Sequence, residues 1–283
     1  MTGLDQFSGG GKADSEYNNR FHRKIMVIDG KIGYTEGINL ADEYINEISV
    51  YGHWKDCALR LEGEAVRELT RLFIIDWGMD TKKYVKIRED YYPVVNSKGE
   101  GYVIAFGDAP KPLRKTRVCQ ELLKTMFSSP LSYMYMTSPY LILDNDMLQS
   151  LENAALRGVD VRIIVPNIPD KKIIKFMGYS YYLRLLSSGV KIYEYTPGFI
   201  HAKTFISDDK YAMVGTINLD YRSLVHHFEN GVWMYGIESK STLKKDYLET
   251  VEKSREIKNE EVENASWYIK PPQAALRFLA PLM

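Results

Sequence analysis

The sequence predicts an α/β protein of two similar halves with mixed sheets packed around a shared active site. Two observations support this prediction. Strand-like apolar runs alternate with helix-length segments through most of the 283 residues. In addition, the pattern His-x-Lys-x4-Asp, followed by Asn ten residues after the Asp, occurs twice, starting at His22 and at His201. One chance copy would be unusual, so two copies with the same offsets indicate an internal duplication.

The second half has the more complete pattern. Its predicted strands lie at residues 102–107, 133–138, 159–165, 190–195, 203–207, 211–214 and 229–235. Its predicted helices lie at residues 118–128, 144–157 and 171–187, with a charged helix from about residue 239. Gly158 and Gly189 follow the second and third of these helices, as expected for residues that end a helix. The second motif lies on the strand pair at 203–207 and 211–214.

The first half repeats only the end of that order. Strands are expected at residues 24–29, 31–35 and 56–61, and Gly63 precedes a helix that is expected to run to about Trp77. Only 21 mostly polar residues precede His22, so the first half lacks the strands and helices that precede His201. The expected organisation is therefore a disordered lead-in (1–18), a partial first half (19–100) and a complete second half (101–283).

Composition sets limits on the partners. Lys+Arg and Asp+Glu both total 37, so the sequence predicts no broad nucleic-acid-binding surface. Two cysteines are too few for a disulfide framework. The sequence contains no run of 18 apolar residues, so it predicts no membrane-spanning helix.

The two motifs contain the residue types that phosphoryl chemistry requires. In a strand, His22 and Lys24 point to the same face, as do His201 and Lys203, so both pairs can project into one cleft. A histidine can act as nucleophile or acid near neutral pH, and a lysine can hold a phosphate oxygen. The candidate catalytic residues are His22, Lys24, Asp29, His201, Lys203 and Asp208.

Some of these positions have alternative roles. Asp29 and Asp208 stand at strand ends, where a turn or a lysine partner is the natural role of a carboxylate. Asn39 and Asn218 are candidate phosphate donors, and the alternative for each is a helix N-cap.

A catalytic histidine needs a carboxylate on its second ring nitrogen. Asp56 and Glu229 are the candidates, because they begin corresponding strands in the two halves; a solvated carboxylate at a strand end is the alternative. The spacing of His226, His227 and Glu229 suggests a metal site, but the sequence offers no third ligand at suitable spacing, so no metal is expected.

These motifs and the segments between them resemble the phospholipase D superfamily, and within it the bacterial cardiolipin synthases. The resemblance runs from about residue 19 to the end of the chain. It rests on the segments GINLADEY (37–44), GHWKD (52–56), LEGEAV (61–66), SPY (138–140), GVDVR (158–162), IVPN (164–167), GFIHAK (198–203), NLDYRS (218–223) and LAPL (279–282).

The resemblance implies the phospholipase D fold and phosphatidyl transfer. One histidine, by family analogy His22, would attack the phosphorus of phosphatidylglycerol and release glycerol. His201 would protonate the leaving alcohol and then deprotonate the hydroxyl of a second phosphatidylglycerol, giving cardiolipin. No cofactor is implied. The implied partners are phosphatidylglycerol and a bacterial membrane surface, without nucleic acid, and no oligomeric state is implied.

Two departures accompany the resemblance. Glu36 replaces a glycine that the family usually has, which puts a carboxylate near the first site. Related full-length synthases also carry membrane helices and a complete first half before the first motif, so the resemblance implies a C-terminal catalytic portion.

Alternative functions are a hydrolysing phospholipase D or a nuclease of the same superfamily, and an inactive fragment. For membrane contact, residues 176–183 suggest either an interfacial helix or a helix packed on the sheet, and the apolar tail at 274–283 is a second candidate.

Overall fold

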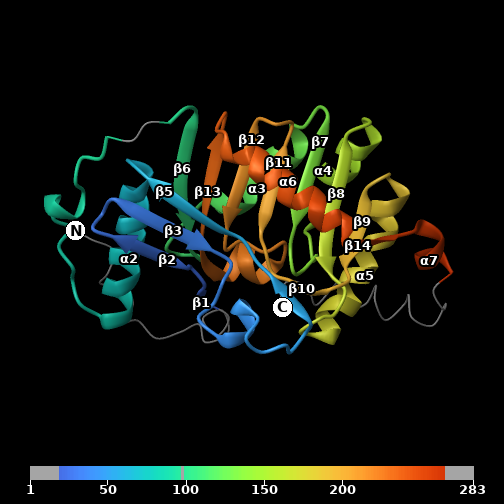
Figure 1. Ribbon diagram of the computed structural model, residues 1–283, viewed down its shortest axis with the longest axis horizontal. Helices are drawn as coiled ribbons and strands as arrows, with labels where there is room; N and C mark the ends of the chain where they lie inside the picture. The colour runs from blue at the N-terminus through green and yellow to red at the C-terminus, as the bar shows by residue number, and fades with distance from the viewer. Residues whose placement is uncertain (1–18, 97–98, 265–283) are drawn as a thin grey trace.

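The computed structural model describes residues 19–96 and 99–264 (Figure 1). The expected lead-in at 1–18 and the apolar tail at 274–283 lie outside the described residues. Within them, no helix combines the length and the apolar character needed to cross a membrane.

A mixed nine-stranded sheet forms the centre of the molecule (Figure 1). The strands follow the order β1 (Arg20–Phe21), β13 (His227–Tyr235), β12 (Tyr211–Gly215), β11 (Thr204–Ser207), β7 (Tyr133–Thr137), β8 (Asp160–Pro166), β9 (Lys191–Tyr195) and β14 (Ser254–Ile257), and β6 (Tyr102–Asp108) also pairs with β13. β7, β8 and β9 run parallel, whereas β11, β12, β13 and β6 pair antiparallel. Most strand residues are buried, because elements pack on both faces of this sheet.

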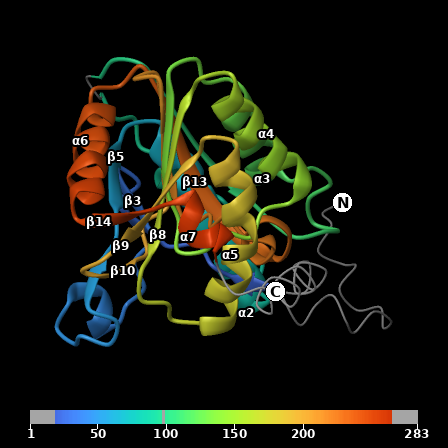
Figure 2. The ribbon, with the colours of Figure 1, turned by 90° about the vertical axis from the view of Figure 1, so that its right-hand side faces the viewer.

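Helices cover both faces of the nine-stranded sheet (Figure 2). One face carries α3 (Val118–Ser128), α4 (Asn145–Leu156) and α5 (Lys172–Ser187), whose apolar residues form the largest core with the strands. The opposite face carries α6 (Ser239–Glu252), where Tyr247 stacks on Tyr135. β14 and the short α7 (Asn259–Glu263), which the sequence did not predict, follow α6.

The aromatic segment at 176–183 packs on the sheet and does not form an interfacial surface. Met177, Tyr181 and Tyr182 on α5 are buried in the core. Of the two expectations for this segment, packing is therefore the correct one.

The first half adds a three-stranded antiparallel sheet of β2 (Ile25–Ile28), β3 (Ile32–Glu36) and β5 (Ala58–Glu62), with α2 (Ala65–Thr81) beside it. This small sheet packs on the large one through a shared apolar core. At the contact, the buried Asn230 amide donates a hydrogen bond of 2.7 Å to the Thr35 hydroxyl. β3 and β13 therefore form one of the contacts between the two halves.

The two motif strands differ in their neighbours. β11 lies between β12 and β7 and is buried along its length. β2 pairs with β3 on one side, and no described strand pairs with its other side. Met26 and Ile28 of β2 are exposed, because they lie on the face opposite to Ile25 and Val27, which pack on the core.

Candidate active site

Two short parallel strand pairs bring the motif histidines to their partners. β1 pairs with β13 so that Phe21 lies opposite Phe228, and the next residues are His22 and Glu229. β10 (Gly198–Ile200) pairs in the same way with β4 (His53–Lys55), and Ile200 lies opposite Lys55. The residues that follow this second pair are His201 and Asp56.

Each histidine therefore meets the carboxylate of the other half. Nδ1 of His22 lies 2.9 Å from Oε2 of Glu229, and Nδ1 of His201 lies 2.7 Å from Oδ2 of Asp56. Because a carboxylate only accepts hydrogen bonds, Nδ1 carries the proton in both rings. The Nε2 lone pair of a neutral ring then remains for chemistry.

Each motif lysine is held beside its histidine. Nζ of Lys24 donates to the backbone carbonyl of His22 at 2.9 Å, and Nζ of Lys203 donates to the backbone carbonyl of His201. Burial lowers the pKa of Lys24 to about 8 and that of Lys203, which is 1% exposed, to about 7. An anion bound beside these amines would favour their charged forms. A phosphate-binding role for the two lysines stays a prediction.

The two carboxylates are buried and ionised. Burial alone would raise the pKa of Glu229, but the charge and hydrogen bond of His22 hold it well below the ordinary range. Burial also acts to raise the pKa of Asp56, and the hydrogen bond from His201 and the charge of Lys203 lower it overall. Both groups therefore remain charged hydrogen-bond acceptors for the histidines.

Gly37 makes room for the Asp56 carboxylate. A Cβ atom added to Gly37 would overlap Oδ1 of Asp56. The corresponding position in the second motif is Thr216, whose hydroxyl donates to Glu229. Glu229 is thus held by the hydroxyl of Thr216, whereas Asp56 lies directly against the backbone at Gly37.

His201 lies in an aromatic environment. Its ring packs edge-on against Tyr44 at 5.3 Å and tilted against Trp54 at 5.4 Å, and Phe199 lies 6.0 Å away. Burial is the main cause that lowers the pKa of His201 to about 4, with the charge of Lys203 acting in the same direction. His201 is therefore neutral at pH 7 in the unliganded site.

Both motif asparagines face the same cavity, and neither caps a helix. The N-caps of η1 (Asp42–Ile45) and η3 (Arg222–His226) are Ala41 and Tyr221. Asn39 donates to the Tyr44 hydroxyl. Oδ1 of Asn218 is buried and has no hydrogen-bond partner among the described residues. The alternative N-cap role is thus wrong for both.

A cavity of about 300 Å³ joins the two half-sites. Its lining residues come from both halves: His22, Asn39, Tyr44, Trp54, Tyr140, Ile142, Asp170, Lys171, Ile174, Phe199, His201, Asn218, Asp220, Arg222 and His227. Sequence reasoning did not assign a site role to the aromatic residues, Asp170, Lys171 or Arg222. Several of them stand in segments that carry the family resemblance, which is the one signal that could have found them.

Asp29 and Asp208 do not join this site. Both adopt a left-handed backbone, with φ values of 51° and 53°, in turns at the ends of the motif strands. The Asp208 carboxylate accepts three backbone N–H bonds, from Leu131, Ser132 and Tyr133, at 2.8–2.9 Å. Both residues therefore have the alternative role that the sequence suggested, a structural role in a turn. Asp208 also holds the loop before β7 through these hydrogen bonds.

Glu36 lies close enough to the first half-site to interact with it. Burial raises its pKa, and the nearby Asp56 charge raises it further, whereas Lys24 lowers it. It is not among the residues that line the cavity. Its carboxylate thus contributes to the charge balance around Lys24.

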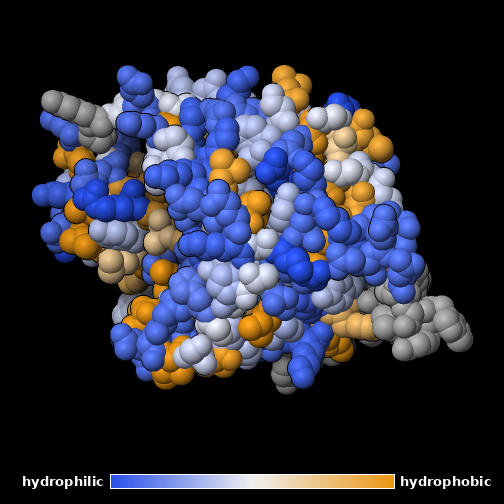
Figure 3. Space-filling view, turned by 45° about the vertical axis from the view of Figure 1, so that its right-hand side comes forward, coloured by the Kyte–Doolittle hydropathy of each residue, from blue (hydrophilic) through white to orange (hydrophobic). Residues whose placement is uncertain are grey.

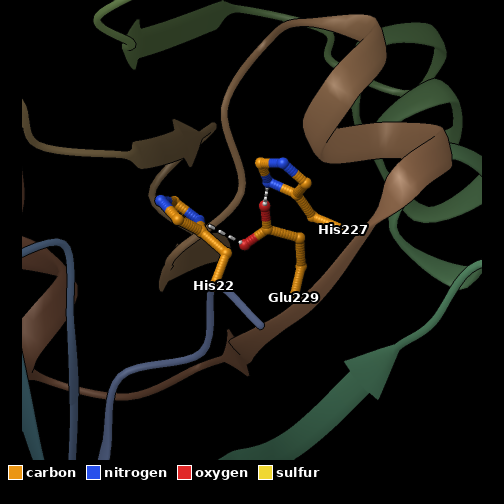
Figure 4. Close-up of side chains that lie close together, drawn as sticks. All are labelled: His22, His227 and Glu229. Carbon is orange, nitrogen blue, oxygen red and sulfur yellow. Dashed lines mark hydrogen bonds and ion pairs between the residues drawn. The ribbon is translucent and has the colours of Figure 1, made fainter. Parts of the chain in front are cut away.

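His227 completes a cluster that sequence spacing did not reveal (Figure 4). Its Nδ1 lies 3.3 Å from Oε1 of Glu229, and its ligand atom, with those of His22 and Glu229, falls within 4.8 Å of the others. His22 is thus the third donor that the His-His-x-Glu spacing lacked. The Glu229 oxygens also accept hydrogen bonds from Thr216 and Ser223. Two hydroxyls and two rings therefore surround this carboxylate, which favours a hydrogen-bonded cluster over a metal site.

Comparisons with known proteins show which chains are similar to this one. Residues 123–250 match the family described as "Cardiolipin synthase, PLD-like domain". The chain is 44% identical over 270 residues to an uncharacterised protein of Streptococcus mutans, and 39% identical over 268 residues to the cardiolipin synthase of Halalkalibacterium halodurans. Each match covers 94% of this chain but only 58% and 53%, respectively, of the relative.

A solved structure shares the fold. The crystal structure of phosphatidylserine synthase from Haemophilus influenzae Rd KW20 matches with a TM-score of 0.68 and 17% identity, over 94% of this chain and 70% of that chain. The predicted α/β fold with mixed sheets is confirmed by this likeness.

Proposed function

We infer that the chain belongs to the phospholipase D superfamily, with a domain of the cardiolipin synthase type, and we propose that it transfers a phosphatidyl group between two phosphatidylglycerol molecules. The products are cardiolipin and glycerol. One observation carries the proposal: two histidine–carboxylate pairs, each built from both halves, place their histidines at one cavity, with the half-buried Lys24 and the buried Lys203 beside them.

The proposed reaction has two steps. Nε2 of His22 attacks the phosphorus, and His201 gives a proton to the departing glycerol oxygen. His201, now neutral, takes the proton from the hydroxyl of the second phosphatidylglycerol, which attacks the phosphorus and releases His22. Bond formation and proton transfer balance, and both histidines return to their initial state.

The electrostatics of the site support this assignment. A general base must be neutral, and the low pKa of His201 keeps it so at pH 7 in the empty cavity. An anionic phosphodiester beside His201 would raise its pKa, which favours the protonated form that the first step needs. Lys24, Lys203, Asn39 and Asn218 would hold the phosphate oxygens as charge develops on them.

The same half-sites also suit hydrolysis by a phospholipase D or cleavage of a nucleic acid. Equal numbers of acidic and basic residues favour a lipid substrate over nucleic acid, whose binding draws on a strongly basic surface. Whether water or a lipid alcohol reaches the histidine adduct distinguishes hydrolysis from transfer.

Contact with the membrane would come from the loop between β3 and β4. Ile45 and Ile48 in this loop are 63% and 52% exposed, and Leu40 and Val50 are also exposed. Hydrophobic residues gather at the lower edge in Figure 3, where this loop lies in Figure 1. The loop also supplies Tyr44 to the cavity, so its insertion into lipid would bring the site to the surface of the bilayer.

The loop also carries Asp42, Glu43 and Glu47. Attachment through it would therefore depend on apolar burial more than on attraction to anionic lipids. Replacing Ile45 and Ile48 by serine should weaken sedimentation with phosphatidylglycerol vesicles.

The transfer proposal is tested with purified chain and phosphatidylglycerol vesicles. Cardiolipin and glycerol should form in equal amounts, and His22→Ala or His201→Ala should abolish both. The cardiolipin synthase of Halalkalibacterium halodurans serves as the positive control. Phosphatidic acid without cardiolipin would replace transfer by hydrolysis, and no product from this chain would refute activity of the isolated chain.

A further inference from the structure

A carboxylate lines the cavity where an anionic phosphodiester is expected to bind. Asp170 is half-buried and precedes α5. A second carboxylate in the lining, Asp220, is buried and accepts the backbone N–H of Ser223 at 2.7 Å, which accounts for its position. Asp170 has no such backbone partner among the described residues and would repel a bound phosphate. Its position therefore points to a group that donates hydrogen bonds and carries no negative charge.

A helix-capping role does not explain Asp170. Acidic residues are common at helix N-termini, but the N-cap of α5 is Lys171, and no side-chain cap bond forms there. The group that positions Asp170 is Tyr140, whose hydroxyl donates to Oδ2 at 2.7 Å. Burial raises the pKa of Tyr140, and the adjacent Asp170 charge raises it further, so the phenol remains a donor.

A cation lies beside this pair. Nζ of Lys171 is 5.7 Å from the centre of the Tyr140 ring, and the structure records no carboxylate partner for it among the described residues. Lys175, one turn further, is already paired with Glu194 at 3.0 Å. A hollow of about 30 Å³, large enough for one small polar group, shares Tyr140, Asp170 and Lys171 with the main cavity.

We propose that Asp170, positioned by Tyr140, accepts hydrogen bonds from the free hydroxyls of a phosphoglycerol head group, and that Lys171 faces a phosphate attached to it. The two hydroxyls of a glycerol head group are adjacent, so one carboxylate can accept from both. This inference rests on the proposed function and adds the part of the substrate that distinguishes phosphatidylglycerol from lipids without head-group hydroxyls.

The test is the equilibrium binding of two soluble probes, measured by calorimetry. One is glycerol methyl phosphate, a phosphodiester that carries the two head-group hydroxyls, and the other is propyl methyl phosphate, which has the same phosphodiester and no hydroxyl. The unsubstituted chain should bind the diol about tenfold more tightly, the difference that one hydrogen bond to a charged acceptor can supply.

Asp170→Asn and Asp170→Ala should bring this ratio close to one. They should also bind propyl methyl phosphate at least as tightly as the unsubstituted chain, because a repulsive charge is removed. Asp146→Asn is the matched control, since that carboxylate is on α4, outside the cavity, and 76% exposed. Its ratio should not change. Circular dichroism melting shows that each variant is folded.

Two outcomes overturn the inference: no preference for the diol in the unsubstituted chain, or a preference that survives in both Asp170 variants. Binding needs no turnover, so the result is separate from the vesicle assay. If the chain prefers the diol but makes no cardiolipin, the proposed subsite is supported and the proposed transfer is refuted. If the chain makes cardiolipin but does not prefer the diol, the proposed transfer is supported and the proposed subsite is refuted.

Discussion

The crossed pairing of histidines and carboxylates predicts that each carboxylate controls the histidine of the other half. Asp56→Asn and Glu229→Gln remove the negative charge and keep the shape of the side chain. Asp56→Asn should then disturb His201, and Glu229→Gln should disturb His22, because these are the pairs in contact.

The size of the effect follows from the geometry. The Asp56 side chain is 3% exposed, and its bond to His201 is 2.7 Å long, so a charge-assisted hydrogen bond worth about 1.5–3 kcal/mol is lost. This corresponds to about 10–150-fold in rate. The amide also permits the wrong ring tautomer, which in comparable histidine–aspartate systems costs up to about 10⁴-fold. We expect kcat to fall by about 10²–10⁴-fold in each variant.

Two measurements check this prediction. Initial rates of cardiolipin formation give the loss in kcat, and NMR of labelled histidines as a function of pH identifies the affected ring. Asp56 raises the pKa of His201, so Asp56→Asn should lower it below its value of about 4, and the His22 signals should keep their positions. Asp90→Asn, at an exposed carboxylate paired with Arg88, is the control.

The reasoning is refuted if Asp56→Asn shifts His22 and spares His201. It is equally refuted if either variant keeps kcat within about threefold while remaining folded.

Three further predictions concern single positions. The pKa of Lys203 is about 7 in the folded protein and 10.5 ordinarily, so the unfolded chain binds more protons between these two pH values. The free energy of unfolding should therefore rise with pH in this range, by at most about 1.4 kcal/mol per pH unit. In urea unfolding, Lys203→Met should show a weaker dependence of this free energy on pH. Gly37→Ala would displace the Asp56 carboxylate and should lower kcat about a hundredfold in the vesicle assay with little change in Tm, and an unchanged kcat would contradict the overlap. Asp208→Ala should destabilise the fold by about 1–2 kcal/mol in urea titrations yet leave kcat unchanged, whereas a loss of turnover in folded protein would restore a direct catalytic role.

Local patterns were enough to predict most strands and helices of the second half. The strand at 133–138 and the helix at 118–128 appear within one residue of their predicted bounds, because apolar periodicity and the flanking Gly, Pro and acidic residues act locally. The three-residue strands β4 and β10 and the two-residue β1 were not predicted as such. They exist because of pairing between residues more than 140 positions apart, and no local signal encodes this pairing.

The site was predictable as a set of residues but not as an arrangement. Duplication identified both histidines and the corresponding carboxylates Asp56 and Glu229. Which carboxylate meets which histidine depends on the register of β1 on β13 and of β10 on β4. His227 and Asp170 reach the cavity through tertiary packing, so their place in the site could not be read from their sequence neighbours.

The crossed register also relates this chain to symmetric assemblies. In an isologous dimer, residue i of one subunit contacts residue j of its partner, and j contacts i in return. His22 with Glu229 and His201 with Asp56 reproduce that reciprocity inside one polypeptide. A single ancestral half with one histidine and one carboxylate would give the same pairs as a homodimer. Each pair now spans both halves, so a change in the carboxylate of one half affects the histidine of the other half. Selection therefore acts on the two halves together.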